Sequence, residues 1–415
     1  MNAGFDVEKV RSHFPSLARR VNGQQAVYFD GPAGSQVPAQ VVSSVADYLL
    51  HSNANEGGVF TTSIETVQIL DAAHRRVADF LGSADPETVI FGANMTSLTF
   101  ALSRALARTW SAGDEIIVTH LDHDANVTPW VLAARDAGAV VRHVAVRPED
   151  GTLDLSHYRS LLSDRTRLVA VGYASNITGS INPVSQMIAE AHAVGALTFV
   201  DAVHYAPHGL IDVADLKCDF LACSAYKFFG PHVGILWGRR ELLESLEAYK
   251  LRPASDAVPG KWMTGTQNHE GIAGTAAAVD YLAELGRAIN PHAEARRDAL
   301  ESAYESIAAY ERELVEPLIA GLTSCPDVRV WGITRSEEFD QRVPTVSFTH
   351  QRHTPDDIAT FLASRGIFVW SGNFYALPFT EAAELEPKGT VRVGLLHYNT
   401  LHEVDRLLAA LDELS

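Results

Sequence analysis

One lysine stands among aromatic residues in the middle of the chain. Lys227 comes soon after the apolar run 220–223 and is followed at once by Phe228 and Phe229. A lysine normally keeps its ammonium group in water, so this setting predicts a buried amine with a special role. Burial disfavours the charged form, and the neutral amine is the form that condenses with a carbonyl group. Lys227 is therefore a candidate for covalent attachment of an aldehyde.

A carboxylate closes the apolar segment one strand earlier. Residues 196–201 read ALTFVD and end in Asp201. Pyridoxal phosphate (PLP) requires such a pair, because a lysine forms a Schiff base with its aldehyde while an acid keeps its pyridine nitrogen protonated. Taken alone, Lys227 is better explained as a snorkelling surface lysine and Asp201 as a helix cap. The ordered features around the two residues favour the cofactor interpretation.

Other polar residues follow predicted strand ends. The segment 92–97 (GANMTS) joins a strand to a helix, so its N–H groups and hydroxyls either bind a phosphate or cap the helix. His123 could stack on a planar cofactor and shuttle protons. His120 and His123 have no third clustered ligand, which disfavours a metal site. Ser224 could donate to a phosphate near the lysine.

Two further residues leave alternatives open. His204 lies three residues after Asp201 and could reach that acid or a phenolic oxygen, or serve as a structural imidazole. Arg392 is a lone arginine in a short apolar strand. A substrate α-carboxylate would pair with it in a bidentate manner, and a structural salt bridge would do so equally well.

Apolar strands alternate with helices over more than half of the chain. This pattern predicts a mostly parallel seven-stranded sheet covered by helices on both faces, which is an α/β fold. Ligands bind such sheets beyond the carboxyl ends of the strands, where the polar residues above are expected. The predicted strands span residues 88–92, 115–120, 140–146, 167–173, 198–201, 220–224 and 233–237.

The pattern changes after about residue 270. Long helices at 271–287 and 292–322 precede short strands, among them 367–370, which predicts a smaller α+β domain. We therefore expect an N-terminal arm at 1–25 packing with the small domain. A large PLP-binding domain at 26–270 and a small C-terminal domain at 271–415 would follow.

Composition narrows the classes of partner. The net charge of −18 disfavours nucleic acids and anionic membranes and favours a small-molecule substrate. The three cysteines, expected to be buried thiols, form no metal-binding spacing. No secretory signal and no long apolar run occur, so a cytoplasmic protein is expected.

Together these segments resemble the class V aminotransferase family of fold type I PLP enzymes, and most closely its cysteine desulfurase-like branch. The resemblance implies the fold type I architecture, an amino-acid substrate, and a homodimer with shared active sites. It covers nearly the whole chain through the motifs VRSHFPSL, YFDGPAGSQVP, DHDANVTPW, SNITGSINP, VDAVHYAPH, SAYKFFGPHVGILWG, TGTQNH and RVGLLHYNTLHEVDRL.

The resemblance also implies residue roles. Lys227 is the Schiff-base lysine, Asp201 the pyridinium partner, His123 the stacking histidine and Arg392 the carboxylate-binding arginine. His204 replaces the usual Gln near the phenolic oxygen. The other expected cofactor contacts are Asn176 beside it, the phosphate-loop residues Asn94, Met95 and Thr96, the phosphate ligands Ser224 and Tyr226 (the latter more often His), and Thr266, which reaches the neighbouring subunit's phosphate.

The chain departs from this branch where desulfurases carry their nucleophilic cysteine. On the matching loop, Tyr375 stands at the cysteine's position, Asn373 at that of a histidine and Trp370 at that of an arginine. Asn373 and Tyr375 are expected to contact the substrate. A phenol with a pKa near ~10 cannot replace a thiolate in forming a persulfide.

These substitutions predict a C–S lyase that acts by β-elimination on cysteine-like or cystine-like substrates without a persulfide. Transamination is the next alternative, and epimerisation with Tyr375 or His123 as a second acid is the third. A non-catalytic PLP-binding protein is a hypothesis of another class.

Overall fold

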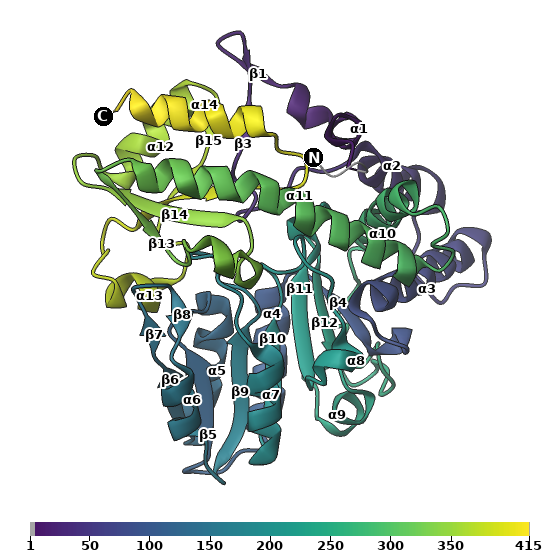
Figure 1. Ribbon diagram of the computed structural model, residues 1–415. Coiled ribbons are helices and arrows are strands. Elements are labelled where there is room, and N and C mark those ends of the chain that lie inside the picture. The colour runs from purple at the N-terminus through teal and green to yellow at the C-terminus, as the bar shows by residue number, and fades with distance from the viewer. Residues whose placement is uncertain (1–4, 415) are drawn as a thin grey trace.

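The computed structural model describes residues 5–414, and a seven-stranded sheet forms its centre (Figure 1). Six strands run parallel, and β12 is antiparallel to both of its neighbours. The predicted fold class is thereby confirmed. In spatial order the strands are β4 (Val89–Gly92), β12 (Gly234–Gly238), β11 (Phe220–Ser224), β10 (Leu197–Asp201), β9 (Thr166–Gly172), β5 (Glu115–Thr119) and β6 (Val140–Val144).

The sheet is buried on both faces because its central strands are apolar throughout. Every residue of β11 and β12 is buried. On one face Leu221 and Cys223 join a core with helices α3 (Thr61–Leu81), α6 (Leu155–Leu161), α7 (Val184–Ala193) and α10 (His269–Ile289). On the other face Phe220 and Ala222 pack with α4 (Met95–Ala107) and α5 (Thr128–Ala137). These two layers hold the strand ends, and the side chains on them, in place.

A glycine lets α4 start close to the sheet. A Cβ built on Gly234 of β12 would lie 2.3 Å from the backbone carbon of Asn94. Asn94 caps α4, since its Oδ1 accepts the Ser97 N–H at 2.8 Å. The helix consequently begins at Met95, inside the segment 92–97 that was expected to precede it. Its first turn lies near the end of β11, because Gly234 pairs with Ser224.

The C-terminal part of the chain lies across one end of the sheet (Figure 1). Its antiparallel sheet has the order β13 (Val328–Trp331), β14 (Thr345–His350), β17 (Thr390–Gly394), β16 (Trp370–Gly372). Helices α11 (Arg296–Ser324), α12 (Pro355–Ser364) and α14 (Leu401–Asp412) share a core with it.

The strand expected at 367–370 is two strands with different partners. β15 (Ile367–Phe368) pairs with β3 (Val27–Tyr28), whereas β16 pairs with β17. Sequence periodicity could not separate them, because both pieces are short and neither partner is close in sequence.

The N-terminal segment packs against C-terminal residues. In α1 (Val7–Ser12), Arg11 forms an ion pair with Glu403 at 3.0 Å, and Phe14 packs on Tyr398 with ring centroids 5.0 Å apart. Figure 1 shows this purple segment among the green and yellow elements. The domain boundaries expected near residues 25 and 270 stay a prediction. They place β3 in the large domain, although β3 pairs with β15 of the C-terminal part.

The remaining elements connect these layers. They are β1 (Arg20–Val21), β2 (Gln24–Gln25), β7 (Val146–Arg147), β8 (Thr152–Leu153), α2 (Ala39–Asp47), α8 (Val213–Leu216), α9 (Arg240–Ser245), α13 (Leu377–Ala382), the π-turn η2 (Tyr48–Ser52) and the 3₁₀ turns η1 (Pro15–Ala18), η3 (Pro86–Thr88), η4 (Asp124–Asn126), η5 (Ala225–Lys227) and η6 (Ser336–Gln341). No helix within residues 5–414 combines the length and apolar character needed to cross a membrane.

Candidate active site

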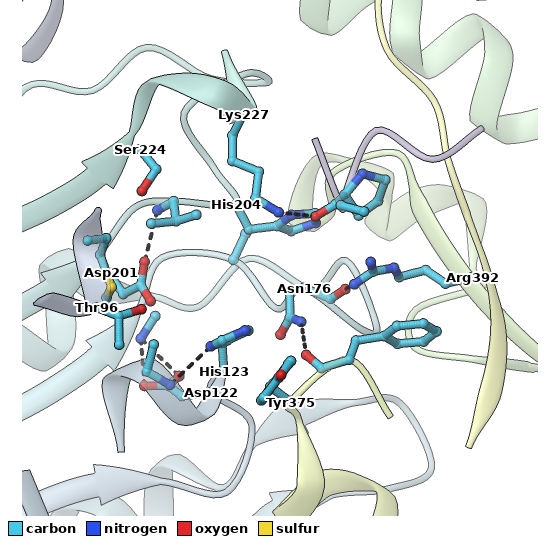
Figure 2. Close-up of a pocket in the computed structure, with 18 of the residues that line it drawn as sticks. Thr96, Asp122, His123, Asn176, Asp201, His204, Ser224, Lys227, Tyr375 and Arg392 are labelled. Atoms are coloured by element: carbon cyan, nitrogen blue, oxygen red, sulfur yellow. Dashed lines mark hydrogen bonds between the residues drawn. The ribbon is translucent and has the colours of Figure 1, made fainter. Parts of the chain in front are cut away.

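A pocket of about 460 Å³ opens where the strand ends meet the C-terminal part. Figure 2 shows Asp201 and Thr96 on one side, Arg392 on the other, and Lys227 reaching between them. All predicted site residues except Thr266 line it: Asn94, Met95, Thr96, His123, Asn176, Asp201, His204, Ser224, Tyr226, Lys227, Asn373, Tyr375 and Arg392.

Lys227 is a buried amine held in a tight turn. It ends η5 directly after β11, and only 8% of it is exposed. Phe228 and Phe229 pack into the core below the turn, so they anchor the lysine rather than enclose its amine. Nζ donates to the Pro32 carbonyl. Burial, with the charge of Arg392, lowers the pKa of Lys227 to about 7 against a smaller opposing effect of Asp201.

Asp201 presents a carboxylate at the end of β10. Its Oδ1 accepts the Val203 N–H at 2.9 Å. Burial raises its pKa to about 6, and Lys227 works against that rise. At neutral pH the group is therefore an anion in a buried setting, which a cationic partner would stabilise.

A second buried carboxylate, Asp122, lines the same pocket and was not identified from the sequence. Asp122 accepts the Gly172 N–H at 2.9 Å and an Asn126 amide hydrogen at 2.7 Å. A Cβ on Gly172 would come within 2.8 Å of Asp122 Oδ1, so this contact requires glycine. Burial raises the pKa of Asp122 to about 7, partly helped by Asp201. The only available signal was its position directly before His123.

His123 packs against Tyr375 and carries no charge at neutral pH. Its Nδ1 accepts the Ala125 N–H at 3.0 Å, and its ring lies 5.2 Å from the ring of Tyr375 with a 30° tilt. Burial, then the charges of Lys227 and Arg392, lower its pKa to about 4. His123 is thus neutral at pH 7, with its Nε2 as the remaining N–H donor.

His204 bonds to the C-terminal part instead of Asp201. Its Nε2 lies 2.9 Å from Thr345 Oγ1 in β14, and burial lowers its pKa. Of the alternatives that the sequence left open, a bond to the acid does not form. His204 still lines the pocket beside Lys227.

Arg392 is buried without an ion pair in the described chain. Its Nη1 donates to the Asn176 carbonyl at 2.8 Å, while its Nε is buried and has no acceptor within residues 5–414. The Phe374 ring lies 3.9 Å from the guanidinium carbon. Burial lowers the pKa of Arg392 to about 9, well above neutrality. Within residues 5–414 the structural salt bridge considered for Arg392 does not form, and a buried cation without such a pair favours an anionic ligand.

The opposite side of the pocket suits an anion. The first turn of the 13-residue helix α4 places Thr96 there, beside Ser224 at the end of β11. The Tyr226 ring stacks on His232, with centroids 4.9 Å apart, and lies 5.0 Å from Lys227 Nζ. Helix N-termini bind phosphate through free N–H groups and the helix dipole.

The turn Asn373–Phe374–Tyr375 forms the outer wall. Phe374 and Tyr375 have positive φ values of 55° and 59°. Asn176 donates to the Phe374 carbonyl at 2.8 Å, and the Asp124 N–H donates to the Tyr375 carbonyl at 2.8 Å. Phe374 was not identified from the sequence, which offered no signal beyond its place next to Tyr375.

No cysteine is among the described residues that line the pocket. Cys218 and Cys223 are buried, as expected, and Cys325 is only partly buried, contrary to the expectation. Thr266 contributes to a different pocket, together with Asn55 and Glu56. Within residues 5–414 no cluster of three or more His, Cys, Asp or Glu is arranged to hold a metal ion.

The donor set of the pocket fits PLP. Lys227 supplies an amine with a lowered pKa, and Asp201 supplies a buried carboxylate. The buried Arg392 Nε and Asn176 Oδ1 lack partners in the described chain, as expected of groups that face a ligand. The site therefore offers a partner for an aldehyde, a pyridine nitrogen and a phosphate.

Comparison with known proteins agrees with this chemistry. The sequence profile of the family Aminotransferase class-V matches residues 27–407. A cysteine desulfurase of Pectobacterium carotovorum subsp. carotovorum (strain PC1) is 33% identical over 425 residues, covering 99% of this chain and 98% of the relative. A cysteine desulfurase of Klebsiella pneumoniae (strain 342) is 33% identical over 429 residues, with coverage of 99% and 98%.

Solved structures show the same relationship. The apo cysteine desulfurase of Thermococcus onnurineus NA1 superposes with a TM-score of 0.86 at 28% identity, covering 98% of this chain and 97% of that one. The cysteine desulfurase CsdA (S-sulfonic acid) of Escherichia coli gives 0.83 at 28% identity, with coverage of 99% and 98%.

The fold and the site define a PLP-dependent enzyme of fold type I. The chain belongs to the class V aminotransferase family, and its relatives include cysteine desulfurases. The predicted family, enzyme class and cofactor are confirmed.

Proposed function

We propose that this protein is a PLP-dependent C–S lyase that cleaves cysteine-like or cystine-like amino acids by β-elimination. One observation carries the proposal: the pocket combines Lys227, Asp201 and Arg392 with a tyrosine, Tyr375, and no thiol among its described lining residues. PLP, when bound, supplies a ring that withdraws electrons from the substrate Cα.

We assign the cofactor to one half of the pocket. Lys227 Nζ would hold the aldehyde carbon, and the Asp201 carboxylate would pair with the pyridine N–H. The His123 ring would cover the ring face, with His204 and Asn176 at its edge. The phosphate would take N–H and hydroxyl donors at the end of β11 and the start of α4, from Asn94, Met95, Thr96, Ser224 and Tyr226.

The substrate belongs to the other half. Arg392 would bind the α-carboxylate, because its buried Nε has no acceptor in the described chain. The neutral amine of Lys227 would remove the α-proton and return a proton to the departing sulfur. Asn373 and Tyr375 would border the side chain that leaves.

The missing thiol decides between two outcomes for the sulfur. Desulfuration that leaves the sulfur on the protein as a persulfide needs a cysteine thiolate to attack the substrate sulfur. A phenol such as that of Tyr375 does not form a persulfide. With an uncharged wall instead, the Cβ–S bond breaks and its electron pair leaves with the sulfur, which accepts a proton. Water then hydrolyses the released dehydroamino acid to pyruvate and ammonia, and the sulfur is released as a thiol, or as a persulfide of cysteine if the substrate is cystine.

Product analysis tests this proposal. The holoenzyme is incubated with cystine or a cysteine S-conjugate, and pyruvate and thiol-containing product are measured, with Lys227→Arg as the inactive control. Pyruvate equal to substrate consumed is expected. Amino-acid loss only in the presence of a keto acid would instead indicate transamination, and deuterium entry at Cα without consumption would indicate epimerisation. Formation of alanine from cysteine, with the sulfur held on the protein as a persulfide, would contradict the proposal.

We further propose a homodimer. Apolar side chains gather around α2, η2 and the start of α3, and they include Val59, which is 97% exposed, and Leu50, which is 73% exposed. Such a patch is typical of an interaction surface. Thr266 lies away from its own pocket, as a residue that serves the partner's phosphate would.

A further inference from the structure

Three residues around the proposed carboxylate site close a ring of contacts. Arg392 Nη1 donates to the Asn176 carbonyl at 2.8 Å. The Asn176 amide donates to the Phe374 carbonyl at 2.8 Å, and the Phe374 ring lies 3.9 Å from the Arg392 guanidinium carbon. Figure 2 shows Asn176 and Arg392 next to each other on this side of the pocket. The ring joins three distant parts of the chain through β17, the loop after β9 and the turn after β16.

The ring of contacts fixes the orientation of the arginine. Hydrogen bonding through Nη1 and stacking on an aromatic face together restrict rotation of the guanidinium plane. The Nε side is left buried and without an acceptor in residues 5–414. A bidentate carboxylate contact depends on that plane, so preorganisation lowers the cost of binding.

The same contacts hold the turn in place. Phe374 and Tyr375 both have positive φ, a conformation that non-glycine residues adopt only when their surroundings enforce it. The Asp124 N–H donates to the Tyr375 carbonyl at 2.8 Å, and the Asn373 amide donates to Glu386 at 3.1 Å. A turn held by these hydrogen bonds is a fixed wall of the pocket rather than a mobile loop.

We propose that Phe374 is a positioning residue: with Asn176 it holds the Arg392 guanidinium ready for the substrate α-carboxylate and fixes the 373–375 turn as a rigid wall of the substrate site. This inference rests on the assignment of Arg392 in the proposed function, and it does not depend on which reaction follows binding.

The first test measures binding of L-alanine, which carries the α-carboxylate but no leaving group, to the holoenzyme through its visible spectrum. Phe374→Leu removes the aromatic face at similar volume and is expected to weaken binding about 3- to 30-fold. Phe374→Tyr keeps the face and should restore affinity to near that of the wild type. Because leucine keeps an apolar side chain of similar volume, a role in packing alone would leave binding by Phe374→Leu close to that of the wild type.

A matched control exists elsewhere on the chain. Phe361 lies 3.6 Å from the guanidinium carbon of Arg365 and, like Phe374, is partly buried, but it is outside the pocket. Phe361→Leu should leave L-alanine binding unchanged. Equal binding by Phe374→Leu and the wild type, with weak binding by Arg392→Gln, would overturn the positioning role and leave the function standing. Unchanged binding by Arg392→Gln would overturn both.

The second test needs no cofactor. Because the Asp124 N–H bonds to the Tyr375 carbonyl, hydrogen exchange at this amide reports whether the turn is held. In the cofactor-free protein, Phe374→Leu should speed exchange at Asp124 several-fold, while Phe361→Leu and Phe374→Tyr should not. Fast exchange at Asp124 in the wild type would show a mobile turn and contradict the inference.

Discussion

Burial is the main reason why the pKa of the Lys227 amine is low, and two neighbouring charges adjust it. Burial and Arg392 lower its pKa, and Asp201 raises it by a smaller amount, so the amine is half neutral near pH 7. In water, a lysine would be almost wholly protonated at that pH. The chain thus provides a nucleophile without a separate base.

The pH dependence of cofactor attachment follows from this pKa. Only the neutral amine attacks the aldehyde, so protonation below pH 7 removes the reactive form. The rate at which cofactor-free protein takes up PLP should be constant above pH about 8 and fall roughly tenfold per pH unit well below 7. Stopped-flow absorbance measures this rate, and a midpoint near the ordinary lysine pKa would contradict the assigned environment.

Arg392 should act on both substrate and lysine. Arg392→Gln removes a charge that lowers the pKa of Lys227, so the midpoint of the uptake profile should move to higher pH. The same change should weaken amino-acid binding on the order of 100-fold by removing the carboxylate's partner. Arg392→Lys keeps a charge and should leave the midpoint nearly unshifted. An identical midpoint for Arg392→Gln and the wild type would count against this coupling.

Single residues were predictable where their chemistry is unusual for their setting. Lys227 and Arg392 stand out in the sequence alone, because each is a charged residue among aromatic or apolar neighbours. Phe374 and Asp122 do not, because their roles depend on contacts with Asn176 and Gly172, which are made only after folding.

At the scale of elements, helix α4 begins where we propose that the phosphate of PLP binds. Its cap Asn94 bonds to the Ser97 N–H and sits against Gly234, which sets the helix N-terminus beside the pocket. Strand and helix types were predicted well because their apolar runs are long. The start of α4 was missed because the cap, rather than hydrophobic spacing, determines it.

Removal of this cap should have two effects. Asn94→Ala should cost about 1 kcal/mol of stability and also weaken PLP binding, because the helix end would fray beneath the phosphate. Thr354→Ala removes the cap of α12, away from the pocket, and should cost a similar amount of stability without affecting PLP. Thermal unfolding and a PLP titration separate the two effects. Equal PLP affinity in both variants would contradict a phosphate site at α4.

At the scale of the molecule, the pocket depends on parts far apart in sequence. Lys227 and Asp201 extend from the large sheet, whereas Arg392 and Tyr375 come from the C-terminal part. The sequence predicted the large sheet and the C-terminal part but not the interface between them. Contacts such as His204 with Thr345 and the pairing of β3 with β15 form this interface. Such long-range contacts leave no periodic signal.

The proposed dimer is tested by charge insertion in the exposed patch. Wild-type protein should sediment at twice the 45.1 kDa of one chain. Val59→Lys should shift it toward the monomer and lower activity, because Thr266 would no longer reach a partner. Leu401, 47% exposed on α14, provides a control, and Leu401→Lys should remain dimeric. A monomeric wild type with full activity would refute shared sites.

The site of cofactor attachment is the most direct test of the role proposed for Lys227. The protein is loaded with PLP, reduced with borohydride and digested, and the modified peptide is identified by mass spectrometry. We expect the pyridoxyl group on Lys227 and no modification of Lys227→Ala. Attachment to another lysine, or the same visible spectrum in Lys227→Ala, would contradict it.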